Sequence, residues 1–374
     1  MKTTVYLVRH IESEGNICRR NHAQFDNFPT RKGLMQAESL ADRFDSIHVD
    51  AVYSSDLYRA MMTAKPLADR KGLKVQPRRL LREYTIGNWE GTGIGETASR
   101  YPELWNVWLK EPWNHSIPGC DRFEAVADRA YKAILDMAHE NPGKTVVAVS
   151  HVTTITCALT RVLGKPIDAY GTIPGGENTA VSCVEVDGND NMVVRFIADV
   201  SHLPESLKRS NYTGRTIENN FYYDSITDAN RAVFHDMYAK WAIDNGRPSD
   251  SASADKALAS SLSLGSRHAM LAVLMGEYGG FFMVQEDPVL PEDHGLLDAL
   301  YVVPSITEPG MAAEIFGEAL DQMRRKGKRY LVLKEDCGRF TRFFLERFLF
   351  EPMPGLEGYQ RLRITVPGLE GPVY

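Results

Sequence analysis

The sequence predicts an α/β fold in which helices cover a mostly parallel sheet. Three short, mostly apolar runs that contain β-branched or aromatic residues have the composition of strands; they lie at 5–8, 50–53 and 145–149. The first and third have the composition of buried strands of a parallel sheet. A helical pattern follows each run after a polar turn or loop. Strands that alternate with helices in this way are typical of a layered α/β domain.

The first strand ends at a cation and an imidazole. Val5–Val8 lead directly into Arg9 and His10, and a polar turn containing glycine comes next. In open α/β sheets, ligands bind beyond the carboxyl ends of the strands. The pair therefore suggests chemistry on an anion, although by itself it is explained equally well as two polar residues that end a strand.

The second strand is followed by another cation. Asp56 is the expected N-cap of a helix that runs from Leu57 to about Lys71. Arg59 would then lie in the first helical turn, directed back over the end of strand 50–53. This placement would bring a guanidinium group to the same edge of the sheet.

The third strand ends in a second imidazole. Strand 145–149 is followed by Ser150 and His151, and the turn-rich segment 80–91 carries the carboxylate of Glu83. Two strands that end in histidine and one that is followed by arginine indicate a common site rather than chance.

Together these segments resemble the histidine phosphatase superfamily, also called the phosphoglycerate mutase-like family. The similarity spans roughly residues 1–200, and the matching motifs are RHIESEGN at 9–16, SSDLYRAMMTA at 54–64, LREYTIGNWEG at 81–91 and SH at 150–151. It implies a three-layer sandwich around a mostly parallel sheet. The family usually has glycine after each catalytic histidine, whereas this chain has Ile11 and Val152.

The residues in these motifs suit phosphoryl transfer. Such transfer depends on positioning and charge stabilisation, and a neutral imidazole with a pKa of about 6.5 is a competent nucleophile. The resemblance implies that His10 forms a phosphohistidine and that Glu83 is the general acid and then the base. It assigns phosphate binding to four other side chains: Arg9, Asn16, Arg59 and His151. No metal is expected.

Each of these residues also has a simpler explanation when it is considered alone. Glu83 could be a surface carboxylate. His151 could be a hydrogen-bonded histidine at a strand end, and Arg59 could pair with Asp56 on a helix surface. The occurrence of all four segments in one chain favours the catalytic interpretation.

Composition and charge limit the class of protein. With 374 residues, 43% of them hydrophobic, the chain has the size and make-up of two or three globular domains. A net charge of −6 argues against nucleic acid or an anionic membrane as a partner. Five scattered cysteines without C-x-x-C spacing, and no apolar leader or membrane span, indicate a cytoplasmic protein with reduced thiols.

Two further stretches flank the motifs. Arg19 and Arg20 lie in a polar loop expected at the mouth of the site, where they would either be solvated or attract phosphate esters. Four of the five tryptophans fall between residues 89 and 113. This clustering predicts either an aromatic lid, which would favour an apolar or planar leaving group, or a small separate core.

The pattern changes after residue 202. We predict a first domain over 1–202, a polar linker over 203–217 and an α+β domain over 218–374. The last segment is similar to the GNAT acetyltransferase family, on the basis of YVVPSITEPGMAAEIFGEALDQMRRKG at 301–327, YLVLK at 330–334 and FTRFFLERFLFEPM at 340–353.

The GNAT resemblance implies acetyl-CoA as a possible cofactor. In that family, backbone N–H groups at a helix N-terminus hold the pyrophosphate, and Gly310 and Ala312 match the small residues of the loop. Thr307, Pro309 and Leu345 depart from the family pattern, and Pro309 has no N–H to donate. We therefore expect a degenerate module in preference to a working acetyltransferase. Such a module would serve docking, dimerisation or ligand sensing.

Three functions compete at this point. The favoured one is metal-independent hydrolysis of a small-molecule phosphate ester through a phosphohistidine. The second is phosphoglycerate mutase-type transfer on the same scaffold, and the third is a bifunctional or acyl-CoA-binding protein with N-acetyltransferase activity. The sequence specifies neither the natural substrate nor the oligomeric state.

Overall fold

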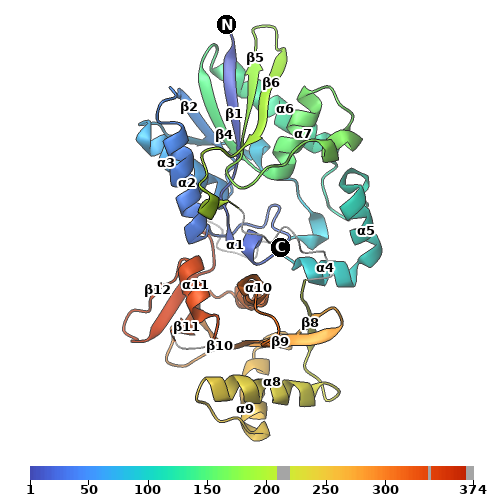
Figure 1. Ribbon diagram of the computed structural model, residues 1–374, viewed down its shortest axis with the longest axis vertical. Helices are drawn as coiled ribbons and strands as arrows, with labels where there is room; N and C mark the ends of the chain where they lie inside the picture. The colour runs from blue at the N-terminus through green and yellow to red at the C-terminus, as the bar shows by residue number, and fades with distance from the viewer. Residues whose placement is uncertain (209–219, 336–337, 368–374) are drawn as a thin grey trace. The chain divides into compact units, whose positions relative to one another are not determined.

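The computed structural model describes residues 1–208, 220–335 and 338–367, which form two compact units (Figure 1). The first unit comprises Met1–Ser13, His22–Glu90 and Pro102–Thr213, and the second comprises Glu14–Asn21, Gly91–Tyr101 and Gly214–Tyr374. The domain boundaries 1–202, 203–217 and 218–374 stay a prediction, since residues 209–217 of the expected linker lie outside the described residues.

A six-stranded sheet with strand order β3-β2-β4-β1-β5-β6 organises the first unit. The strands are β1 (Thr3–Arg9), β2 (Ala51–Ser54), β3 (Val75–Pro77), β4 (Thr145–Ser150), β5 (Val181–Val186) and β6 (Met192–Asp199). β1 to β4 are mutually parallel, whereas β5 and β6 form an antiparallel hairpin at one edge. The predicted mostly parallel sheet is confirmed.

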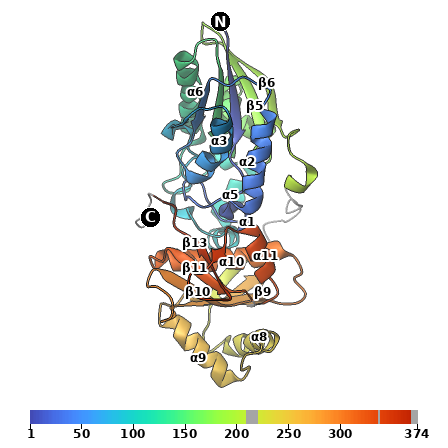
Figure 2. The same cartoon turned by 90° about the vertical axis from the view of Figure 1, so that its left-hand side faces the viewer.

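Helices cover both faces of this sheet (Figures 1 and 2). Alternate residues of β1 point in opposite directions, as the strand period of two requires. Val5 and Leu7 pack with the helices α6 (Phe123–Glu140) and α7 (Val152–Val162), whereas Val8 packs with α2 (Arg31–Arg43) and α3 (Tyr58–Arg70). This arrangement is the expected three-layer sandwich.

The start of α2 has a side-chain cap, whereas the start of α3 has none. The Thr30 side chain caps α2 by accepting a hydrogen bond from the Gly33 N–H. The expected cap of α3 is wrong: Leu57 occupies the N-cap position and makes no side-chain cap. Asp56 instead binds Arg82 through two bonds of 2.6 and 2.7 Å. A bidentate guanidinium is a stronger partner for a carboxylate than one backbone N–H.

The tryptophan-rich stretch of the first unit contributes to an aromatic cluster that includes Phe123 of α6. The choice between an aromatic lid and a small separate core stays a prediction. Trp89 and Trp105 are buried, and their ring centroids are 5.6 Å apart. Trp108 stacks on Tyr84, and an unexpected helix, α5 (Pro102–Lys110), carries two of these rings. Short 3₁₀ turns connect the elements of this unit at Arg79–Leu81, Gly87–Trp89, Pro112–Asn114, Ile167–Thr172 and Glu205–Leu207.

A seven-stranded mixed sheet with order β12-β13-β11-β10-β9-β8-β7 organises the second unit. The strands are β7 (Tyr222–Ser225), β8 (Ala269–Leu274), β9 (Glu277–Gln285), β10 (His294–Val302), β11 (Tyr330–Lys334), β12 (Glu351–Pro352) and β13 (Tyr359–Arg363). Among these described strands, β10 and β11 form the one parallel pair. The predicted α+β character of this part of the chain is present.

Six helices accompany this sheet among the described residues: α1 (Glu14–Ile17), α4 (Ile94–Arg100), α8 (Arg231–Asp244), α9 (Ser251–Leu262), α10 (Pro309–Arg325) and α11 (Thr341–Arg347). α8 and α9 pack on one face of the sheet and α10 covers the other (Figure 2). The Ser/Ala-rich stretch 249–266, for which a loose loop was the alternative, contains α9, whose first turn is capped by Asp250.

Within residues 1–208, 220–335 and 338–367, no helix combines the length and the hydropathy that crossing a bilayer needs.

Candidate active site

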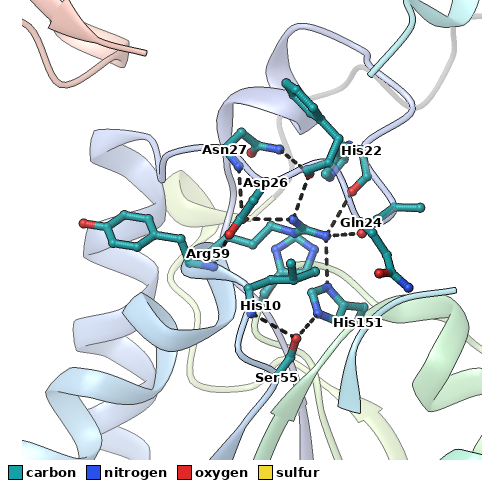
Figure 3. Close-up of polar contacts among 12 residues, drawn as sticks. His10, His22, Gln24, Asp26, Asn27, Ser55, Arg59 and His151 are labelled. Carbon is teal, nitrogen blue, oxygen red and sulfur yellow. Dashed lines mark hydrogen bonds and ion pairs between the residues drawn. The ribbon is translucent and has the colours of Figure 1, made fainter. Parts of the chain in front are cut away.

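The register of two neighbouring strands brings the two predicted histidines together. β1 and β4 are parallel, with Arg9 opposite Ser150, so His10 and His151 follow at the same edge of the sheet. The His10 N–H donates to the Ser150 carbonyl at 2.9 Å, and the two imidazole centroids are 5.1 Å apart (Figure 3).

One hydrogen bond fixes the tautomer of His10. Its Nδ1 lies 2.7 Å from the carbonyl oxygen of Ile11, and because a carbonyl can only accept, Nδ1 must carry the proton. The lone pair of the neutral ring is therefore on Nε2. The residue is only 3% exposed, so this nitrogen is held in a defined direction.

Arg59 lies at the centre of the polar contacts in Figure 3. Its Nη2 donates to the carbonyls of His22 at 2.9 Å and Ala23 at 2.6 Å, and its Nη1 donates to the Phe25 carbonyl at 3.2 Å. It also forms an ion pair of 3.3 Å with Asp26. Arg59 thus holds the loop His22–Asp26 in place, and it does not form the surface pair with Asp56 that was the alternative explanation. Direct contact of Arg59 with phosphate stays a prediction.

His151 is oriented by two partners on opposite sides of its ring. Arg59 Nη2 is 3.3 Å from its Nδ1, and a guanidinium can only donate, so Nδ1 is the acceptor. Nε2 then carries the proton and donates to Ser55 Oγ at 2.8 Å. Ser55 had no role in the sequence analysis, although it lies in the motif SSDLYRAMMTA.

Burial and nearby cations keep both imidazoles neutral. Desolvation, followed by the charge of Arg59, lowers the pKa of His10 and of His151 well below the usual 6.5. Arg9 and His22 lower the pKa of His10 further. At neutral pH, Nε2 of His10 is therefore available as a nucleophile.

Glu83 is buried at the N-terminus of α7, which excludes the surface alternative. Its carboxylate accepts hydrogen bonds from the N–H groups of Thr153 at 3.1 Å and Thr154 at 2.9 Å, and from the Thr154 hydroxyl at 2.9 Å. A negative charge is favoured at a helix N-terminus. Because the helix begins directly after His151, these bonds hold the carboxylate at the same edge of the sheet as the two histidines.

A second buried carboxylate supports the loop that Arg59 holds. Glu90 accepts hydrogen bonds from the N–H groups of Gln24 at 2.9 Å, Phe25 at 2.9 Å and Ile86 at 3.2 Å. Burial raises its pKa. Glu90 was not singled out as a site residue, although it lies in the motif that contains Glu83.

The other predicted site residues are divided between the two units. Arg9 is half-buried and donates to the Gly176 carbonyl at 2.7 Å. Asn16 lies on α1, which belongs to the second unit, and so do Gly310 and Ala312 at the start of α10. Among the described residues, no three His, Cys, Asp or Glu side chains are grouped as metal ligands.

Comparison with known proteins identifies the family of the chain. The family model described as "Histidine phosphatase superfamily (branch 1)" matches residues 5–199, slightly more than half of the chain. The chain belongs to the histidine phosphatase superfamily. Its family match ends before the described strands of the second sheet begin.

Several named proteins are similar to this histidine phosphatase. Phosphoserine phosphatase 1 of Hydrogenobacter thermophilus is 29% identical over 190 residues, which is 51% of this chain and 90% of the relative. Probable phosphoglycerate mutase GpmB of Salmonella choleraesuis is 30% identical over 204 residues, or 53% and 94%. The solved structure of Bacillus stearothermophilus YhfR matches with a TM-score of 0.52 and 30% identity, over 54% of this chain and 98% of that one.

We expect removal of Asp26 to destabilise the histidine phosphatase far more than removal of an exposed partner. Asp26→Ala leaves the buried charge of Arg59 without its carboxylate, and breaking a buried pair costs about 3–5 kcal/mol. Asp42→Ala removes an exposed partner of Arg70 and should leave the free energy of unfolding nearly unchanged. Urea unfolding measures both, and equal losses would contradict the structural role given to Arg59.

We also expect stability to fall as the pH drops below about 6.5. The unfolded chain binds protons at His10 and His151 near that pH, whereas the folded chain does not until a much lower pH. Each such group adds about 1.4 kcal/mol per pH unit to the fall in the free energy of unfolding. Urea unfolding at pH 7.5, 6.5 and 5.5 measures the free energy of unfolding at each pH. Its dependence on pH should be weaker for His10→Ala than for the wild type. An unchanged slope would mean that His10 is protonated in the folded protein.

Proposed function

We propose that this histidine phosphatase hydrolyses a small-molecule phosphomonoester through a phosphohistidine on His10. The observation that carries the proposal is the bond from Nδ1 to the Ile11 carbonyl, because it leaves the lone pair on Nε2. The low pKa of the ring keeps that nitrogen unprotonated. A neutral, oriented imidazole beside two cationic side chains is suited to attack on a phosphate monoester.

The proposed reaction has two steps. Nε2 of His10 attacks phosphorus, the P–O ester bond breaks, and Glu83, which must be protonated for this step, gives its proton to the departing alkoxide. Glu83 then takes a proton from water, the resulting hydroxide attacks the phosphohistidine, and the P–N bond breaks to release inorganic phosphate. The lone pair returns to Nε2, so the enzyme ends in its starting state.

Phosphate binding is assigned to Arg9, Asn16, Arg59 and His151. Two Nη2 donors of Arg59 are engaged with the carbonyls of His22 and Ala23. In our proposal, phosphate oxygens replace these carbonyls when the ester binds, since a charged acceptor forms a stronger bond with a guanidinium than a neutral carbonyl does. The loop His22–Asp26 would then move as substrate enters.

The relatives support a small ester as substrate and leave mutase activity as the alternative. One relative is named a phosphoserine phosphatase and another a probable phosphoglycerate mutase. A mutase would share the first step but return the phosphoryl group to an alcohol instead of water. Interconversion of phosphoglycerates with a bisphosphate primer distinguishes that alternative from hydrolysis.

For the second unit we propose a GNAT-like fold, but we propose no acetyltransferase activity. The element order β10-α10-β11, with parallel pairing of the two strands from His294 to Leu296, supports it. The proposed acetyl-CoA cradle does not fit well. Glu308 places a negative charge at the N-cap, Pro309 has no N–H, and Ala312 is fully buried. No acetyl-transfer step is therefore proposed.

The nucleophile is tested by substitution in an assay without added metal. We expect His10→Ala to lose at least about 99% of the hydrolysis of p-nitrophenyl phosphate, because the covalent route is closed. His139→Ala removes an exposed histidine and should retain wild-type activity. Substantial hydrolysis by folded His10→Ala would contradict the proposal.

A further inference from the structure

The hydroxyl of Thr154 lies between two oxygen atoms of the segment that carries Glu83. Its Oγ1 is 2.8 Å from the backbone carbonyl oxygen of Arg82 and 2.9 Å from Oε1 of Glu83. Thr154 belongs to the first turn of α7 and is 1% exposed, and all three residues lie in the first unit. The hydroxyl is therefore buried against both oxygens.

The single proton of this hydroxyl cannot serve both oxygens at the same time. A hydroxyl has one proton and two lone pairs, whereas a carbonyl oxygen can only accept. If the hydroxyl donates to the Arg82 carbonyl, a lone pair of Oγ1 faces Oε1, and the contact with Glu83 is a hydrogen bond only when Glu83 carries a proton. If the hydroxyl donates to Oε1 instead, Glu83 is ionised. The two directions of this proton thus match the two protonation states of Glu83.

The other partners of the Glu83 carboxyl group favour its ionised state. The N–H groups of Tyr84, Thr153 and Thr154 donate to it at 3.2, 3.1 and 2.9 Å. Hydrogen bonds to the charged form favour that form, yet the acid step of the proposed reaction requires a proton on Glu83. The Thr154 hydroxyl differs from these N–H groups because it can accept a hydrogen bond from the protonated acid as well as donate one to the carboxylate.

Arg129 of α6 allows the hydroxyl to turn without leaving a buried oxygen unpaired. Its Nη1 donates to the carbonyl oxygens of Leu80 and Arg82, each at 2.7 Å. A carbonyl oxygen has two lone pairs, so that of Arg82 can accept from Arg129 alone or from Arg129 and Thr154 together. Since an unpaired buried acceptor is costly, Arg129 makes both directions of the hydroxyl proton compatible with the folded site.

We propose that Thr154 is a positioning residue for the proton of Glu83. In the resting enzyme, Glu83 is protonated and donates to Oγ1, while the hydroxyl donates to the Arg82 carbonyl. As the ester bond breaks, the departing alkoxide becomes the stronger acceptor and takes the proton from Glu83. The hydroxyl then turns to the carboxylate, and it turns back once Glu83 has taken a proton from water, so Thr154 keeps its own proton throughout. This inference rests on the proposed function, because it supposes that Glu83 is the general acid.

The leaving group of the ester tests this role. Phenolate is a much stronger base than p-nitrophenolate, so hydrolysis of phenyl phosphate depends more on the general acid than hydrolysis of p-nitrophenyl phosphate does. Thr154→Val removes the hydroxyl and keeps the shape of the side chain. We expect kcat/KM to fall about tenfold for phenyl phosphate and by less than about twofold for p-nitrophenyl phosphate, since kcat/KM reports the step in which the leaving group departs.

Two control variants separate the hydroxyl from packing. Thr154→Ser keeps the hydroxyl and should recover most of the phenyl phosphate activity that Thr154→Val loses. Thr160→Val removes another buried hydroxyl of the same helix, which donates to the Thr156 carbonyl, and should leave kcat/KM for both esters unchanged. Where Thr154→Val does not fold, Thr154→Ala takes its place, because alanine favours the helix.

Glu83→Gln separates this inference from the proposed function. It should lower kcat/KM for phenyl phosphate far more than for p-nitrophenyl phosphate, as loss of the general acid requires. If Glu83→Gln shows this difference, but folded Thr154→Val lowers kcat/KM for both esters equally or for neither, or Thr154→Ser is as slow as Thr154→Val, the role of Thr154 is overturned while the proposed function stands. If Glu83→Gln affects both esters equally, Glu83 is not the general acid and both proposals fail.

Discussion

The guanidinium of Arg59, at 1% exposure, is in contact with three carbonyls, one carboxylate and one imidazole. Burying such a charge costs several kcal/mol unless it is paired and hydrogen-bonded. Here the loop His22–Asp26 and His151 engage both Nη groups, whereas Nε has no hydrogen-bond partner among the described residues. The same charge lowers the pKa of His10 and His151. One side chain thus holds a loop and orients one imidazole, and it adds to the effect of burial that keeps both imidazoles neutral.

This position of Arg59 follows from the topology of the first unit. β2 ends at Ser54 and α3 begins at Tyr58, so the arginine lies in the first helical turn beyond the sheet edge. β1 and β4 deliver the two histidines to that edge in matching register. Glu83 joins them because the N-terminus of α7, directly after His151, binds its carboxylate. Parallel strands followed by helices therefore assemble the group from four distant parts of the chain.

Most of the features that could be predicted from the sequence depend on short-range patterns. The strand at Thr145–Ser150 and the histidine after it were evident because β-branched runs and abrupt polar ends are local signals. Charge pairing was not predictable in the same way. Asp56 had a plausible local role as a helix cap but binds Arg82, and Arg20 was expected in solvent but binds Glu318, which is 298 residues away. A basic residue in a polar loop has the same local pattern whether it is solvated or buried, so only the tertiary structure distinguishes the two.

The stereochemical course at phosphorus tests the covalent route most directly. An isotopically chiral phosphate ester is hydrolysed or transferred to an alcohol by the wild-type enzyme, and the configuration of the product is determined. Two successive in-line displacements, first by His10 and then by the acceptor, predict overall retention. Inversion would show a single direct displacement and would contradict a phosphohistidine intermediate on His10.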